Sequence, residues 1–123
     1  MYVIICGGRN YVFNCADRRW LDTLGVMKVY TGGAPGADSS AEWWSKTRGI
    51  HTIVTRADWA TYGKAAGPIR NQEQLDKLLV AGLADGVPMA VVAFPGGKGT
   101  ADMVRRAKGA GVQVIERRLR NAD

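Results

Sequence analysis

The chain has 123 residues, of which 46% are hydrophobic and 23% charged, a composition that predicts a single globular domain over residues 1–123. No apolar run approaches the ~20 residues of a membrane span, and the N-terminus lacks signal-peptide features, so we predict a cytoplasmic protein with no membrane partner. The formal net charge of +6 favours anionic partners. Two cysteines and one histidine form no recognisable ligand set, so no metal is predicted.

Short apolar strands alternate with amphipathic helices along the chain, which is typical of a parallel sheet. Asn14 and Asp17 have the spacing of a capping box at the start of the first helix, and Pro68 fits the first turn of a later one. Residues 56–67 are predicted to form a loop, and residues 117–123 a basic tail in solvent. The predicted strands are 2–6, 27–31, 50–55, 89–94 and 112–116, and the predicted helices are 15–26, 37–48, 68–83 and 100–108.

Glycine-rich segments follow the first, second and fourth predicted strands. Glycine lets a ligand approach the backbone, and the first N–H groups of a helix have no partner within it, so such junctions suit an anion. The carboxyl ends of parallel strands share one edge, which places all three segments together. The alternative is tight turns without a ligand. The backbone positions predicted to contact an anion are Gly7, Gly8, Thr31, Gly32, Gly33, Ala34, Gly36, Pro95, Gly96, Gly97, Gly99 and Thr100.

Several side chains at this edge suit a phosphorylated ligand. Arg9 and Arg70 offer planar guanidinium donors that remain charged, and Lys98 can add a point charge. Surface ion pairs are the alternative role of the two arginines. Asp38 and Asn71 are predicted to cap or orient the backbone at this edge.

Aromatic side chains occur in the predicted loop over residues 56–67. Trp59 and Tyr62 can stack on a nucleobase. They can equally close the core or a contact between subunits.

Together these segments resemble the SLOG superfamily, which includes DprA-like and LOG-like proteins. The resemblance rests on Gly7-Gly8-Arg9 and on residues 31–38, 67–71 and 95–102, in that order. The chain is most similar to the small YspA or YpsA-related branch. The resemblance implies an α/β, Rossmann-like three-layer sandwich with a mainly parallel five-stranded sheet, in the order 3-2-1-4-5. It also implies a nucleotide-derived ligand and a homo-oligomer, a dimer or larger.

The glycine spacing is neither that of a P-loop nor that of a dinucleotide fingerprint, so no nucleotide cofactor is predicted. LOG-like enzymes cleave the bond between a base and ribose 5′-phosphate with a P-G-G-x-G-T-x-x-E motif, and Met103 stands at the position of its glutamate.

Three hypotheses follow from the sequence. The first is a module that binds a nucleotide or nucleotide-derived ligand as a sensor or sequestering protein. The second is a nucleotide phosphoribohydrolase in which Asp102 replaces the glutamate and Arg70 holds the sugar phosphate. The third, ranked lower, is DprA-like binding of single-stranded nucleic acid. Asp102 also has a purely structural interpretation, because an acid near a helix N-terminus interacts favourably with the helix dipole.

Overall fold

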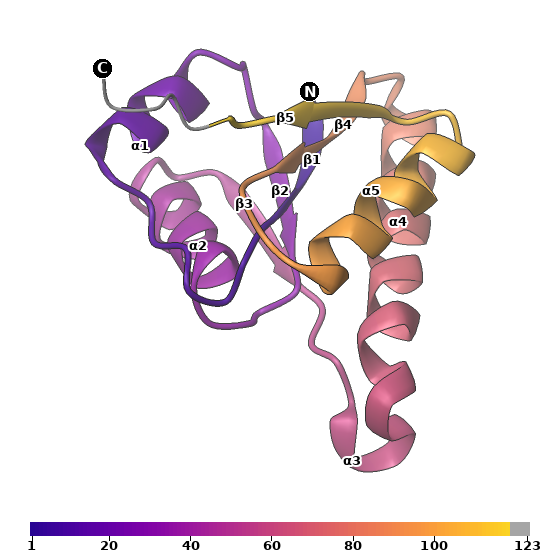
Figure 1. Ribbon diagram of the computed structural model, residues 1–123. Helices are drawn as coiled ribbons and strands as arrows, with labels where there is room; N and C mark the ends of the chain where they lie inside the picture. The colour runs from indigo at the N-terminus through magenta and orange to yellow at the C-terminus, as the bar shows by residue number, and fades with distance from the viewer. Residues whose placement is uncertain (119–123) are drawn as a thin grey trace.

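A computed structural model describes residues 1–118 and contains one five-stranded sheet in which every pairing is parallel (Figure 1). The strand order is β3-β2-β1-β4-β5. The predicted fold class and strand order are therefore confirmed. The strands are β1 (Tyr2–Cys6), β2 (Lys28–Thr31), β3 (His51–Val54), β4 (Met89–Ala93) and β5 (Gln113–Glu116).

Helices cover both faces of the sheet and form two separate cores. Ile5 packs in the cluster with α1 and α2, whereas its neighbour Ile4 packs in the cluster with α4 and α5. Successive strand residues point to opposite faces, so a strand buried on both sides is apolar throughout. The helices are α1 (Cys15–Asp22), α2 (Ala37–Thr47), α3 (Trp59–Tyr62), α4 (Ala66–Asp85) and α5 (Lys98–Gly109). Within residues 1–118, no helix combines the length and the apolarity needed to cross a bilayer.

The first helix begins where the sequence predicts it but ends earlier. The backbone N–H of Asp17 donates to Asn14 Oδ1 at 2.8 Å, and the backbone N–H of Asn14 donates to Asp17 Oδ2 at 3.1 Å, which is the predicted capping box. The helix ends at Asp22 instead of residue 26. Gly25, with φ 69°, turns the chain towards β2, so the predicted last turn of this helix is absent.

The prediction of a loop over residues 56–67 is wrong in part. This segment contains α3 and a 3₁₀ turn, η1 (Gly63–Ala65), and α4 already begins at Ala66. The side chain of Asp58 caps α3 by accepting from the backbone N–H of Thr61 at 3.1 Å. In Figure 1, α3 projects below the body of the molecule. A four-residue helix is too short to show a helical hydrophobic repeat, which explains the error.

The predicted basic tail is also wrong in its first residue. Arg117 Nε donates to Asp17 Oδ1 at 3.0 Å, and its guanidinium lies over Trp20 at 5.0 Å from the ring centroid. Asp17 is fully buried, and a buried carboxylate requires a partner of opposite charge. Arg118 is in solvent as predicted, with a side chain 86% exposed. Arg120, the third arginine of the predicted tail, lies outside the described residues.

Candidate functional site

A cleft of about 700 Å³ opens at the carboxyl edge of the sheet, between the first turns of α4 and α5. The loops after β1, β2 and β4 all reach it, as expected where parallel strands end together. Its volume is in the usual range for small-molecule sites. The predicted residues that line it are Gly7, Arg9, Ala34, Asp38, Trp59, Arg70, Asn71, Gly97, Lys98, Gly99, Thr100 and Asp102.

Some predicted glycines hold the loops together instead of facing this cleft. A Cβ atom at Gly36 would lie 2.3 Å from the carbonyl oxygen of Arg9, and one at Gly96 would lie 2.7 Å from the backbone nitrogen of Gly8. The Gly8 N–H donates to the carbonyl of Pro95 at 2.8 Å. These glycines are therefore required by the contact between the three loops.

Gly97, at the end of the loop after β4, and Gly99, in the first turn of α5, have no such role. A Cβ atom built on Gly97 or Gly99 meets no heavy atom within 4 Å. Neither residue has a positive φ. Both line the cleft, so the absence of their side chains enlarges it. The packing of the chain does not require glycine at either position.

The remaining predicted residues do not line the main cleft. Gly32 and Gly33 line a smaller adjoining hollow of about 250 Å³, to which Arg9, Trp59 and Arg70 also contribute. Thr31 is fully buried. Pro95 and Gly96 line a second, adjoining cleft next to β5. Tyr62, 51% exposed, lines none of these three spaces.

Arg70 is held at the cleft by two hydrogen bonds. Its Nη1 donates to the carbonyl of Gly32 at 2.8 Å, and its Nε donates to Asn71 Oδ1 at 3.2 Å. Burial lowers the pKa of the guanidinium, while nearby Asp38 opposes that change. An arginine remains charged at neutral pH, so the cleft has a fixed cation with a defined orientation.

Asp38 lies under the loop after β2. Burial raises the pKa of its carboxyl, and a hydrogen bond from the backbone N–H of Ala34 and the charge of Arg70 partly offset that effect. The Ala34 N–H lies 3.2 Å from Asp38 Oδ2. The role predicted for Asp38, orienting the backbone of this loop, agrees with this contact.

Asp102 has three side-chain donors on its two oxygens. Oδ1 accepts from Arg105 at 2.5 Å, and Oδ2 accepts from Asn71 at 2.9 Å and from Arg106 at 2.8 Å. Burial by itself would raise the pKa of Asp102, but the hydrogen bonds from Arg106 and Asn71 and the charges of both arginines outweigh it, so the pKa is lowered. Asp102 therefore joins α5 to α4 as an ionised carboxylate.

The positive charge of the cleft exceeds what the sequence predicted. Its lining includes five basic residues and two acidic ones, Asp38 and Asp102. Arg105 was missed, although it follows the lining residue Ala101 by four positions and so shares its helical face. The lining residues that the prediction omitted are Lys64, Gly67, Pro68, Ala101 and Arg105.

Cys6, next to the cleft-lining residue Gly7, is partly buried, and its reactivity can be tested. Burial raises the pKa of Cys6, at the end of β1, to about 12, and nearby Asp38 adds to this effect. Cys15 is exposed. Because only the thiolate reacts, iodoacetamide at pH 8 should modify Cys15 first and Cys6 at least about tenfold more slowly, as measured by peptide mass spectrometry. Equal rates in the folded protein would contradict the raised pKa of Cys6.

The fold and the cleft define a Rossmann-like α/β protein with a basic cleft at the carboxyl edge of its sheet. A model of the YspA, cpYpsA-related SLOG family (YAcAr) matches residues 1–62. The Gene 61 protein of Mycobacterium phage D29 is 36% identical over 107 residues, which span 81% of this chain and 78% of that protein. The chain belongs to the YspA, cpYpsA-related SLOG family, which confirms the predicted resemblance. This membership suggests a role in binding a nucleotide-related ligand.

Proposed function

We propose that the cleft binds a nucleotide or nucleotide-derived ligand, with a phosphoryl group at the first turn of α5. The observation that carries this proposal is the open space beside Gly97 and Gly99. A glycine within a helix is less favourable than alanine by up to about 0.5–1 kcal/mol. At Gly99, the second residue of α5, no close packing of the chain requires glycine. Close approach of a ligand to the backbone accounts for glycine there.

The charges around this turn support an anionic ligand. The first backbone N–H groups of α5 lack partners within the helix and carry its positive dipole end. Lys98 and Thr100 lie on the same turn, and Arg70 stands across the cleft on α4. Within residues 1–118, Arg70 Nη2 has no hydrogen-bond acceptor, which leaves a charged donor for phosphate.

Trp59 is the side chain best placed to contact a nucleobase. It lines the cleft and is 48% exposed, and the guanidinium of Arg9 lies 5.5 Å from its ring centroid. This arrangement makes a base contact on Trp59 possible next to a cation that can reach the phosphate. Tyr62 lies outside the cleft and has no part in this proposal.

The hydrogen bonds and the lowered pKa of Asp102 favour binding without hydrolysis. Both oxygens of Asp102 already accept hydrogen bonds from Asn71, Arg105 and Arg106. A lowered pKa makes this carboxyl a poor proton donor at neutral pH. Met103 is buried in the core beneath α4 and α5. We therefore propose a sensor or sequestering module.

Titration calorimetry with the common nucleoside 5′-monophosphates tests this proposal. We expect Gly99→Val to weaken binding at least tenfold, because its side chain enters the ligand space. Its free energy of unfolding should stay within about 0.5 kcal/mol of the unchanged protein, since a Cβ atom at this position meets no heavy atom within 4 Å. Gly109→Val is the matched control, because it lies in the same helix with equally open surroundings but outside the cleft.

Two results would contradict the proposal. One is no binding of any monophosphate, and the other is equal affinity in the unchanged protein and the Gly99→Val variant. Release of free base from a monophosphate, lost in Asp102→Asn, would establish the phosphoribohydrolase instead.

A further inference from the structure

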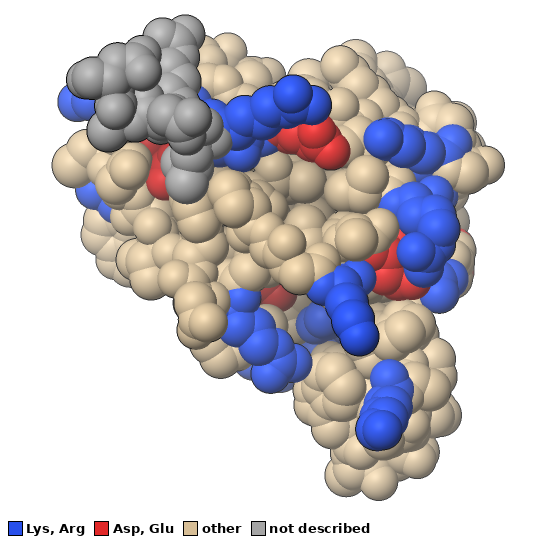
Figure 2. All heavy atoms as spheres, in the orientation of Figure 1, with Lys and Arg blue, Asp and Glu red and all other residues tan. Residues whose placement is uncertain are grey.

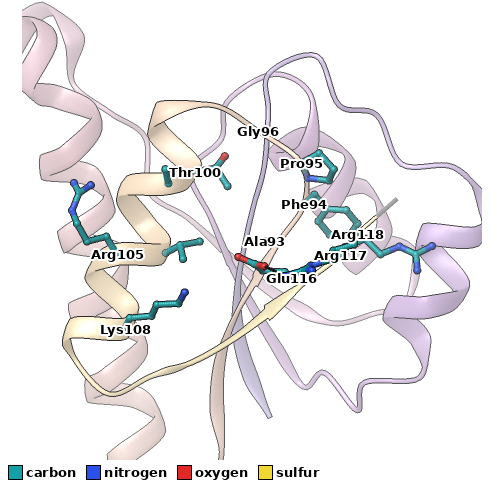
Figure 3. A pocket seen from close by; sticks show the side chains of 12 residues that line it. Ala93, Phe94, Pro95, Gly96, Thr100, Arg105, Lys108, Glu116, Arg117 and Arg118 are labelled. Carbon is teal, nitrogen blue, oxygen red and sulfur yellow. Dashed lines mark hydrogen bonds and ion pairs between the residues drawn. The ribbon is translucent and has the colours of Figure 1, made fainter. Parts of the chain in front are cut away.

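A second cleft, of about 670 Å³, lies on the other side of the first turn of α5 (Figure 3). Ala93 and Phe94 at the end of β4 form its apolar base, and Val104 on α5 forms one wall. It shares Thr100, Ala101 and Arg105 with the first cleft. The two clefts therefore adjoin across the turn at which we place the phosphoryl group.

Polar groups of opposite charge lie at one end of this second cleft. In Figure 3 the amine of Lys108 and the carboxylate of Glu116 both face the space between α5 and β5. Glu116 also accepts a hydrogen bond from Arg118 at 3.3 Å. Arg105 and Arg118 stand at the two sides of the cleft, and Figure 2 shows Lys and Arg side chains spread across this face of the molecule.

The apolar lining and the two opposite charges of the second cleft favour a ligand that has both an apolar ring and a polar edge. An isolated phosphate would meet the negative charge of Glu116, and a purely apolar group would leave Lys108 and Glu116 without new partners. A nucleobase has an apolar ring and an edge with both donors and acceptors, for example an amino group next to a ring nitrogen. The ring would lie against Val104 and over the end of β4, with the edge towards Lys108 and Glu116.

We propose that the second cleft binds the second base of a ligand made of two phosphate-linked nucleotide units. The linking phosphate would cross α5 at Thr100, in its first turn, and at Arg105, in its second turn, which are two of the residues that both clefts share. This inference rests on the proposed function, because the first nucleotide unit occupies the first cleft. The ligand is either a free dinucleotide or part of a nucleic-acid strand.

The test compares adenosine 5′-monophosphate with the 5′-phosphorylated dinucleotide pApA by calorimetry at one fixed salt concentration, and repeats the comparison for the other three bases. In the unchanged protein we expect the dinucleotide of at least one base to bind at least tenfold tighter than its monophosphate. Replacing both Lys108 and Glu116 with alanine should remove most of this advantage and leave the monophosphate affinity unchanged. The matched control replaces Lys46 and Glu42, an exposed ion pair on α2, and should keep the advantage.

The possible results distinguish failure of the second base site from failure of the proposed function of the first cleft. Equal affinities for monophosphate and dinucleotide, or an advantage that survives in the Lys108/Glu116 variant, would overturn the second base site while the first cleft stands. No binding of any compound would overturn the proposed function as well. A 5′-phosphorylated strand of ten nucleotides shows whether the natural ligand is a free dinucleotide or part of a nucleic acid. Binding as tight as that of the dinucleotide indicates nucleic acid. Absence of binding indicates a free dinucleotide.

Discussion

Replacing Arg70 with alanine should weaken nucleotide binding by about 30- to 100-fold, or about 2–3 kcal/mol, because a charged hydrogen bond to phosphate is lost inside a cleft. The guanidinium is held between the carbonyl of Gly32 and the side chain of Asn71, so it is oriented before the ligand arrives. Arg70→Lys should recover only part of the affinity, since an ammonium lacks the planar set of donors that bonds Gly32 and Asn71 and still points Nη2 at a phosphate. Calorimetric titration with the tightest-binding monophosphate measures these changes.

Arg56 supplies the matched control for this variant. Its Nη1 donates to the carbonyl of Gly33 at 2.8 Å, as Arg70 Nη1 does to the carbonyl of Gly32, but Arg56 does not line the main cleft. Arg56→Ala should therefore keep affinity within about threefold of the unchanged protein, as expected for an exposed charge at the edge of a site. Equal losses in the two variants would show that these arginines act on the loop after β2 and not on the ligand.

Asp17→Ala should lower the free energy of unfolding by about 3 kcal/mol, because it removes one member of a buried ion pair. The Asp17 carboxylate is fully buried and accepts from Tyr11 Oη at 2.9 Å, from the backbone N–H of Asn14 at 3.1 Å and from Arg117 Nε at 3.0 Å. The variant loses the side-chain half of the capping box of α1, which is the bond from the Asn14 backbone N–H, together with the link to the chain beyond β5. Urea unfolding followed by tryptophan fluorescence measures the change.

Asp22→Ala tests whether burial of the Asp17 carboxylate causes the large loss of stability expected for Asp17→Ala. Asp22 lies in the same helix and also pairs with a distant arginine, Arg48, at 3.0 Å, but its side chain is 40% exposed. It also accepts from Trp44 Nε1 at 2.9 Å, and we expect a clearly smaller loss of stability than at Asp17, because an exposed ion pair contributes little. A cost at Asp17 no larger than that at Asp22 would contradict the structural role of the buried pair.

The glycines at the carboxyl edge of the sheet divide into two kinds. At Gly36 and Gly96 a Cβ atom would overlap a neighbouring loop, and at Gly8 it would lie only 3.0 Å from the carbonyl oxygen of Pro95. Substitution of these glycines should therefore disturb the architecture of the edge. Gly97 and Gly99 leave space that the chain does not fill. A glycine-rich motif alone does not distinguish these kinds, because the difference depends on which atoms lie around each residue.

Hydrophobic periodicity was sufficient to predict the sheet, because the apolar runs of residues 2–6 and 89–94 can be buried on both sides only between two layers of helices. The position of the glycine segments after those strands was sufficient to predict where a cleft forms. Both signals depend on neighbours within a few residues, so they can be read from the chain itself.

Only the tertiary structure determined which distant side chains meet. Arg117 and Asp17 are 100 residues apart, and no local pattern indicates that the predicted tail supplies the partner of a buried carboxylate. Likewise, Asn71 and the two arginines that hold Asp102 come together only because α4 packs against α5. Such contacts depend on how the helices pack on the sheet. The second cleft also depends on this packing, because residues of α5 and of the end of β5 form it together.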